Sequence, residues 1–347
     1  MKVYFYHAIS IEKNYRAWKI SEFPGHLLYG LTHLYKYGIE SIYHTIPFNP
    51  YQCRLRLMLY NLKSILFCKE SFDAVYAATH YGLELLIFLR ACGLYKKPIV
   101  IWHHTAIVTP SNSIRRLFSK LFYKGIDKVC FFSQPLLENS LKTCKVKKEN
   151  AFLIHWGADL TFFDTLRSLK HRGKQYISTG RERRDFITLI RAFNKTTEQC
   201  DIYVPVGYEI QLAQELKNNA KNIQLSFVEA THIEMAKIAN NAFVIMISCF
   251  DYPYTVGLTS LVEAMALGRP IITTANPNFP IDVEKENIGI KIPHGDVDAW
   301  VKAIQYLSSH PDEAKTMGDN ARSLAERQYN LELFTKEIAS ILLSINN

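Results

Sequence analysis

Residues 242–274 limit what this chain can fold into more than any other stretch of its sequence. Two apolar runs of strand length, 243–248 and 271–274, flank a segment in which apolar residues recur at helical spacing. Gly257 precedes that segment and Gly268 ends it, and glycine is common at both helix boundaries. The pattern predicts two buried parallel strands joined by a helix that begins at the carboxyl edge of the sheet.

Apolar strand-like runs alternate with helical segments along the rest of the chain as well, which predicts an α/β fold with parallel sheets. The length of 347 residues favours two domains over one core. We expect a first domain over residues 1–165, a basic linker over 167–174 and a second domain over 174–330. After the first strand, a loop is predicted up to Pro24 and a single helix over 25–38.

Composition narrows the class of protein. No apolar run is longer than a strand, so no transmembrane helix is predicted, and the first ten residues look like a strand rather than a signal peptide. The seven cysteines are dispersed without a C-x-x-C pair. This usage is typical of a reduced cytoplasmic protein and disfavours a disulfide framework or a zinc site.

Basic residues are concentrated in the first half of the chain. Residues 1–170 contain 23 Lys and Arg against 11 Asp and Glu, whereas the remainder contains 18 against 21. Segments 53–70 and 114–128 mix apolar and basic residues, and each is either an ordinary amphipathic helix or a helix that lies on an anionic membrane. No nucleic-acid-binding motif accompanies the charge, so the expected partner is a phospholipid surface or a phosphorylated acceptor.

Two features of the second domain predict an anion site. The helix after Gly257 offers backbone N–H groups at its start, with two hydroxyl side chains in its first turn. A second helix start follows the strand that ends at Gly180, and the cations clustered there are Arg181, Arg183 and Arg184. Arginines beside helix N-termini suit a diphosphate, and the alternative is a solvated basic loop.

The string LVEAMALGRPIITT, residues 261–274, resembles the "LLEAMALGKPVI" signature of retaining glycosyltransferases of the GT-B fold, the family-4-like group. The turn after Gly180 is similar to that family's phosphate-binding turn, and the resemblance covers most of residues 97–307. It implies a GT-B architecture, in which two doubly wound Rossmann-like domains face a central cleft. It also implies that the C-terminal helix, about residues 331–347, packs back on the first domain.

The resemblance assigns donor-binding roles to Gly25 of the first domain and to residues of the second domain. The groups expected to bind the donor diphosphate are Gly25, Arg181, Arg184, Gly257, Leu258, Thr259 and Ser260. Glu263 is expected to bind the nucleotide ribose, and Phe227 and Val228 stand where the family contacts the base. Many family members carry another glutamate eight residues before Glu263, where this chain has Thr255, so Asp251 or Thr255 is expected to contact the donor sugar.

Histidines end the strand-like run 97–105 and would face the ligand edge of a parallel sheet. Adjacent strand residues point to opposite faces, which disfavours a metal site formed by His103 and His104, whereas a structural pair remains an alternative. In the resembled family a histidine six residues after a proline faces the reacting sugar and acceptor, and His104 has this spacing from Pro98. His104 is therefore the main acceptor candidate, with His103 as the fallback and His26 as a further candidate.

The resemblance implies transfer of a sugar from a nucleotide-sugar, with a UDP-sugar favoured, and retention of anomeric configuration. The expected catalytic residues are His104, Arg184 and Glu263, and no metal is expected because no D-x-D-like motif follows a predicted strand. The basic helices predict, in addition, a lipid or lipid-linked glycan acceptor and a protein that is bound peripherally at the cytoplasmic membrane face. The alternatives are a sugar-nucleotide 2-epimerase of the same fold and a catalytically silent, nucleotide-sugar-binding subunit of a transferase.

Overall fold

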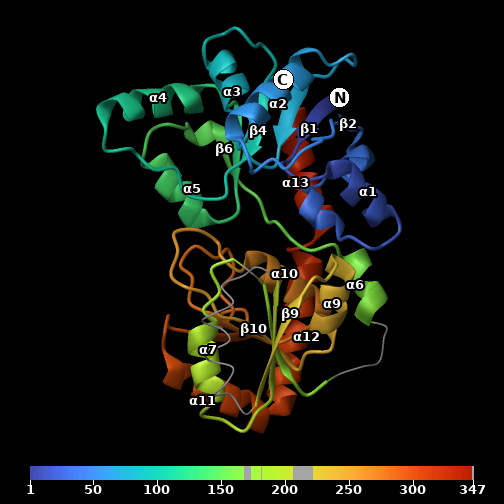
Figure 1. Cartoon of the computed structure of the whole chain (residues 1–347), viewed down its shortest axis with the longest axis vertical. Helices are drawn as coiled ribbons and strands as arrows, with labels where there is room; N and C mark the ends of the chain where they lie inside the picture. Colours follow the sequence, from blue (N-terminus) through green and yellow to red (C-terminus); the bar gives the residue numbers. More distant parts are fainter. Residues whose placement is uncertain (168–172, 181, 206–221, 346–347) are drawn as a thin grey trace. The chain divides into compact units, whose positions relative to one another are not determined.

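The computed structural model describes residues 1–167, 173–180, 182–205 and 222–345, and the chain divides into two compact units. The first unit contains Met1–Ile20, Gly25–Trp156 and Leu331–Asn347, and the second contains Ser21–Pro24 and Gly157–Asn330. The division falls at Gly157, before the expected linker, because helix α6 (Leu160–Arg167) packs against helices of the second unit (Figure 1). Residues 168–172 of that linker lie outside the described residues.

The first unit is built on a six-stranded parallel sheet with the order β2-β1-β3-β4-β5-β6. Its strands are β1 (Lys2–Tyr6), β2 (Glu40–Ile42), β3 (Ala74–Ala77), β4 (Ile99–Trp102), β5 (Lys128–Phe131) and β6 (Ala151–Leu153). Strands β3 and β4 are buried along their whole length, which explains their continuous apolar sequence. The direction in which strands are added to the sheet reverses between β1 and β3.

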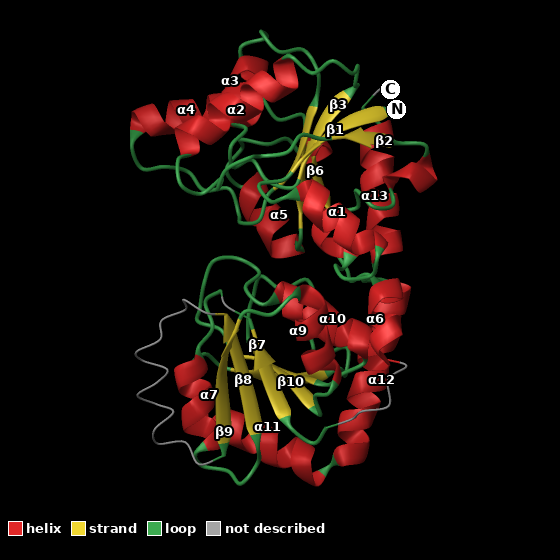
Figure 2. Cartoon of the chain, turned by 45° about the vertical axis from the view of Figure 1, so that its right-hand side comes forward, coloured by secondary structure: helices red, strands yellow, loops and turns green. Residues whose placement is uncertain are grey.

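Helices cover the first sheet, and the secondary structure is shown in Figure 2. They are α1 (Ile11–Lys19), α2 (Arg54–Leu66), α3 (Glu84–Ala91), α4 (Ser113–Lys124), α5 (Gln134–Leu141) and α13 (Leu331–Leu343). Helix α3 packs against both α2 and α4. The C-terminal helix α13 belongs to this unit, where Glu337 accepts hydrogen bonds from the backbone N–H and the ring Nδ1 of His155.

Two sequence predictions for the segment after β1 were wrong. The predicted loop contains α1, which shows Ile11, Tyr15 and Trp18 at helical spacing and a Glu12–Arg16 ion pair at 2.6 Å. The single helix predicted over 25–38 is instead two 3-10 helices, Gly25–Leu28 and Leu34–Tyr37. Consecutive left-handed residues after the first of these, with φ of +51° and +85°, interrupt any continuous α-helix.

The second unit is built on another six-stranded parallel sheet, with the order β12-β11-β10-β7-β8-β9. Its strands are β7 (Tyr176–Thr179), β8 (Cys200–Pro205), β9 (Ile223–Val228), β10 (Val244–Ile247), β11 (Ile271–Thr274) and β12 (Gly289–Ile292). Counted within the unit, this is the strand order 3-2-1-4-5-6 of a Rossmann sheet. The order reverses between β7 and β10, whose register pairs Tyr176 with Val244.

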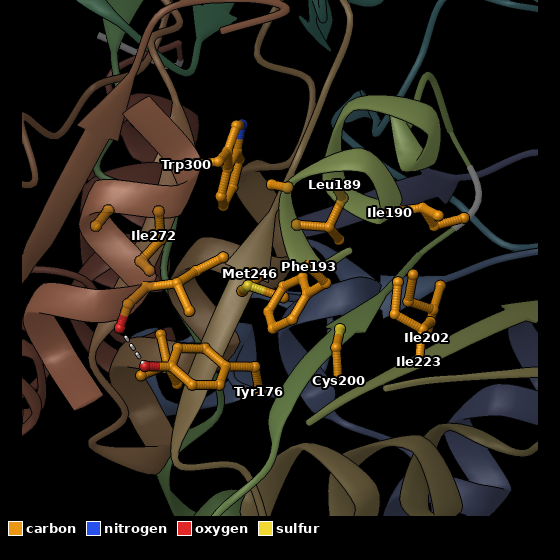
Figure 3. Packing of buried hydrophobic residues seen from close by; sticks show 14 of the residues in the cluster. Tyr176, Leu189, Ile190, Phe193, Cys200, Ile202, Ile223, Met246, Ile272 and Trp300 are labelled. Atoms are coloured by element: carbon orange, nitrogen blue, oxygen red, sulfur yellow. Dashed lines mark hydrogen bonds between the residues drawn. The ribbon is translucent and has the colours of Figure 1, made fainter. Parts of the chain in front are cut away.

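The other helices of the second unit are α7 (Phe186–Phe193), α9 (His232–Asn240), α10 (Leu258–Leu267), α11 (Val297–Ser309) and α12 (Pro311–Arg327). Helices α7 and α11 pack together, and α10 packs against α6, α9 and α12. Figure 3 shows the core between the sheet and the α7–α11 pair, including the fully buried Trp300. The hydroxyl of Tyr176 is satisfied within this core by the Ile304 carbonyl at 2.9 Å.

Candidate functional site

The candidate site of the second unit lies at the carboxyl ends of β7 and β10, where the strand order reverses. Open α/β sheets bind ligands at this place. The turn after β7 and the segment after β10 pair with each other there, since Arg184 and Cys249 face one another in an antiparallel bridge. The adjoining hydrogen bond, from Asp185 N to Ser248 O, measures 3.0 Å. Directly opposed residues of an antiparallel pair project their side chains to the same side, so Arg184 and Cys249 are brought into contact.

Arg184 is the centre of this site, and only 5% of its surface is exposed. Its Nη1 lies 2.8 Å from Cys249 Sγ and its Nη2 lies 2.7 Å from Ser260 Oγ. Its Nε is buried and has no hydrogen-bond partner. Among the described residues, no carboxylate forms an ion pair with this guanidinium. A buried cation therefore stands here with Cys249 Sγ and Ser260 Oγ as its hydrogen-bond partners and with three unused N–H donors.

The start of α10 adjoins this guanidinium. Gly257, the residue before the helix, has a left-handed φ of +92°. A Cβ added there would lie 2.6 Å from Ile247 Cγ2 and 3.0 Å from Arg184 Nη1, so glycine is required for both conformation and space. The N–H of Leu258 already bonds the Thr255 carbonyl at 3.1 Å, which leaves the following N–H groups of the first turn at the open end of the helix.

Electrostatics at the site favour a bound anion. A helix N-terminus carries a partial positive charge of about half an elementary charge, and the Arg184 guanidinium lies beside that of α10. Two positive sources in a nearly dry environment repel each other, and burying a cation without a counter-charge is costly. An anionic ligand that reaches both would remove this cost.

Stacking and hydrogen bonds also connect the loop after β10 to the turn after β7. The Arg183 guanidinium stacks on the Tyr252 ring at 4.4 Å, and Nη2 donates to the Tyr252 hydroxyl at 3.1 Å. The Tyr254 hydroxyl hydrogen-bonds Glu182. These contacts explain how Arg183 is held at a left-handed φ of +52° next to Arg184.

Three further predicted donor-site residues, Asp251, Thr255 and Glu263, lie on the segment after β10 or on α10. Glu263 is half-buried in the second turn of α10, and Arg181 lies outside the described residues. The Asp251 side chain is 79% exposed, with its carboxylate 3.9 Å from His294 Nε2, whereas Thr255 is only 8% exposed.

Phe227 and Val228, the predicted base contacts, end β9 and are both half-buried. Part of the Phe227 side chain packs against the hydrophobic core of the second unit. The two residues therefore stand at the carboxyl edge of the sheet, two strands away from β7.

The predicted acceptor residues belong to the first unit. His103 is buried, and burial, followed by repulsion from His80, lowers its pKa to about 4. Its Nδ1 donates to the Thr105 carbonyl at 2.6 Å, so its Nε2 accepts from the Tyr123 hydroxyl at 2.9 Å. Both ring nitrogens of His103 therefore serve internal contacts.

His104 differs from its neighbour because its side chain is exposed at the end of β4. Its Nε2 lies 2.8 Å from the Ala78 carbonyl, which can only accept, so Nε2 carries the proton and Nδ1 of the neutral ring is an acceptor. Its ring stacks on Tyr29 at 5.9 Å. Gly25 and His26 lie in the first 3-10 helix, where His26 is fully buried against Trp156.

Sequence reasoning missed Cys249 and the pairing of Arg183 with Tyr252. Nothing in a single sequence indicates that residues 65 positions apart form a bridge. The one usable signal was location, because Cys249 follows a buried strand that leads to the ligand edge.

The described residues contain neither a cluster of metal-ligating side chains nor a membrane-spanning helix. No group of three or more His, Cys, Asp or Glu side chains there is arranged to hold a metal ion. In the described part of the chain, no helix combines the length and apolar character needed to cross a bilayer.

This fold has counterparts among known proteins. Residues 176–324 match the family model described as glycosyl transferases group 1. The putative colanic acid biosynthesis glycosyltransferase WcaL of Escherichia coli (strain K12) is 30% identical over 87 residues, or 25% of this chain and 21% of that protein. The chain thus spans about a fifth of the length of this curated relative.

Solved structures match over nearly the whole chain. A glycosyltransferase from Rickettsia africae ESF-5 gives a TM-score of 0.70 at 15% identity, with 100% of this chain and 98% of that chain covered. Anabaena Alr3699/HepE in complex with UDP gives 0.68 at 14% identity, with 99% and 100% covered. Sucrose-phosphate synthase from Thermosynechococcus elongatus gives 0.67 at 19% identity, with 88% and 83% covered.

These likenesses establish the GT-B fold, with two doubly wound α/β units. Within the second unit, residues 176–324 are similar to the glycosyl transferases group 1 family model. The resemblance to GT-B glycosyltransferases predicted from the sequence is therefore confirmed.

Proposed function

We propose that this chain is a glycosyltransferase that transfers a sugar from a nucleotide-sugar to an acceptor with retention of anomeric configuration. The observation that carries the proposal is the buried Arg184 guanidinium beside the N-terminus of α10, without a carboxylate partner among the described residues. A nucleoside diphosphate supplies the missing negative charge. A UDP-sugar is the favoured donor, and the Anabaena structures with UDP and with UDP-glucose support this choice.

The mechanism we infer is electrostatic. As the bond between the sugar and the diphosphate breaks, negative charge develops on the leaving phosphate, where Arg184 and the N–H groups of Thr259 and Ser260 stabilise it. These groups stabilise the charge on the leaving phosphate, as a metal ion does in metal-dependent transferases, so no metal cofactor is required. The leaving phosphate then assists deprotonation of the acceptor hydroxyl, which explains the lack of an obvious general base.

Other residues orient the substrates in this proposal. Glu263 accepts hydrogen bonds from the ribose hydroxyls. His104 accepts a hydrogen bond from a sugar or acceptor hydroxyl through Nδ1, the ring nitrogen without the proton. Asp251 contacts the donor sugar in preference to Thr255, because its carboxylate is exposed while Thr255 is buried. Asp251→Asn should therefore lower kcat more than Thr255→Val does.

A thermal-shift screen with UDP, GDP and ADP and their sugar conjugates, without metal, tests the donor site. A ligand at ~100 times its dissociation constant adds roughly 2.7 kcal/mol of stability. Stabilisation by one diphosphate that is lost in Arg184→Ala, but kept in Arg191→Ala on the exposed side of α7, is the expected result. No shift with any nucleotide would contradict the proposal.

Activity separates this proposal from its alternatives. The isolated chain should release UDP from the donor and produce a glycoside of unchanged anomeric configuration, measured by proton NMR. Binding without turnover would favour a silent subunit. Conversion of the donor into its 2-epimer without any acceptor would favour an epimerase.

We further infer a lipid or lipid-linked glycan acceptor, with the enzyme held peripherally at the cytoplasmic face of an anionic membrane. Helix α4 supports this inference, since none of its residues is buried and its exposed apolar residues are Ile114, Leu117 and Phe118. The helix carries four Arg and Lys residues and no acidic residue. Apolar contacts combined with cations are what an anionic bilayer surface binds.

Liposome flotation tests this surface. Binding to phosphatidylglycerol vesicles at low salt should exceed binding to phosphatidylcholine vesicles and should fall at high salt. Ile114→Ser should weaken binding, whereas Ile20→Ser, a matched change at an isoleucine that is equally 67% exposed, should not. Equal binding to both vesicle types would remove the membrane from the proposal and leave the donor chemistry intact.

A further inference from the structure

We propose that Cys249 is a positioning residue that fixes the guanidinium of Arg184 for the donor diphosphate. The inference rests on the proposed function, because it takes Arg184 to be the diphosphate ligand. The sulfur of Cys249 and the hydroxyl of Ser260 use two of the five guanidinium N–H donors. The other three, including the buried Nε–H, remain for the phosphate oxygens.

The backbone holds Cys249 in place from both sides. Its N–H donates to Thr274 Oγ1 at 3.0 Å, and its carbonyl accepts from His294 Nδ1 at 3.1 Å. The residue is 3% exposed and lies opposite Arg184 in the antiparallel bridge. Because the N–H and the carbonyl of Cys249 are both hydrogen-bonded, the sulfur has a fixed position. The flexible arginine side chain hydrogen-bonds to it there.

Two glycines, Gly180 and Gly257, leave the space that the Arg184 guanidinium occupies. A Cβ at Gly180 would lie 2.5 Å from Arg184 Nη2, and a Cβ at Gly257 would lie 3.0 Å from Nη1 and 3.3 Å from Cys249 Sγ. The guanidinium is therefore confined by main chain on two sides and by the sulfur and the Ser260 hydroxyl at its two ends. Arg184 keeps one orientation, and Cys249 determines it at Nη1.

The chemistry of the thiol suits this task. A cysteine sulfur is a weak hydrogen-bond acceptor, and the geometry places it at Nη1 of the guanidinium. A carboxylate at position 249 would form an ion pair with Arg184 and compete with the diphosphate for its charge. Cys249→Asp should consequently abolish nucleotide binding, while Cys249→Ser should keep it. The serine hydroxyl would lie about 0.4 Å further from Nη1, at about 3.2 Å, within hydrogen-bonding range.

The experiment measures the dissociation constant of the diphosphate found by the thermal-shift screen, with the full chain, by calorimetry. Cys249→Ala should weaken binding about tenfold, the effect of losing one weak bond from a charged donor, and Cys249→Ser should stay within about threefold of the parent chain. Cys200→Ala is the matched control, because Cys200 is a buried thiol in the core of the same unit, 1% exposed. It should lower the melting temperature without changing affinity.

A double-mutant cycle separates positioning from a structural role. If Cys249 acts through the Arg184 guanidinium, adding Cys249→Ala to Arg184→Lys, which keeps the positive charge for the diphosphate, should cause no further loss of affinity. An additive loss, or unchanged affinity in Cys249→Ala, would overturn the inference while wild-type nucleotide binding leaves the proposed function standing. Absence of binding in the wild type would instead defeat the proposed function itself.

Discussion

Substitution of Gly257 by alanine tests the geometry of the anion site most directly. This glycine has a φ of +92°, in the left-handed region that other L-residues avoid. The new methyl group would meet Ile247 Cγ2 at 2.6 Å and Arg184 Nη1 at 3.0 Å. The branched Ile247 is packed in β10 and has little freedom to move, whereas the end of the arginine side chain can shift.

The magnitude follows from two separate costs. A left-handed conformation costs an alanine roughly 1–2 kcal/mol. Overpacking of a buried position costs typically about 1–3 kcal/mol more. The free energy of unfolding of the second unit should therefore fall by about 3 kcal/mol, and its melting temperature by roughly 6–12 °C for a unit of this size. Displacement of Arg184 should weaken nucleotide binding at the same time.

Gly295 provides a matched control within the same unit. Its φ is +71°, and a Cβ there would meet no atom within 4 Å, so Gly295→Ala incurs the conformational cost alone. Differential scanning fluorimetry with and without UDP compares the two variants. Equal melting temperatures, or full nucleotide stabilisation in Gly257→Ala, would refute the argument that this glycine makes room for the arginine.

Other consequences can be measured in the same way. Glu337→Gln should destabilise the protein more at pH 6 than at pH 9, by about 0.5–1 kcal/mol. The hydrogen bond from Glu337 raises the pKa of His155, so this stabilisation is complete below the unfolded-state pKa and is lost as pH rises through the folded-state pKa. Asp185→Ala removes the N-cap bond to Thr188 N at 3.0 Å and should cost about 1 kcal/mol in thermal unfolding. Tyr176→Phe removes hydrogen bonds to Ile304 O and a serine hydroxyl and should lower the free energy of unfolding, measured by urea denaturation, by about 1–2 kcal/mol.

The fold could be predicted from sequence because central strands such as β3, β4, β10 and β11 are buried on both faces. Runs such as 271–274 match the observed strand residue for residue, and a parallel sheet requires such continuous apolar runs. Prediction failed in the segment after the first strand, where tertiary contacts and not the local sequence determine the backbone conformation. Of the two consecutive left-handed residues that split the expected helix, Gly30 is of the type that favours this conformation, whereas Tyr29 gives no such signal.

The site could be predicted in part for a related reason. Helix starts and arginines at strand ends are local features, so Arg184 and Ser260 were identified as diphosphate candidates. The contact between Arg184 and Cys249 is not local, because it depends on the pairing of two loops that follow non-adjacent strands of the sequence. A weakly polar thiol also belongs to none of the residue types associated with phosphate binding.

The contacts that orient Arg184 come from the protein itself, which has an energetic consequence for the proposed diphosphate site. Because Cys249 and Ser260 fix the guanidinium, binding of a diphosphate would require little reorganisation of the donors. Burying this cation beside the N-terminus of α10 costs stability, since no carboxylate among the described residues pairs with it. In the proposed function a diphosphate offsets that cost when it binds, and Arg184 thereby links stability to donor binding.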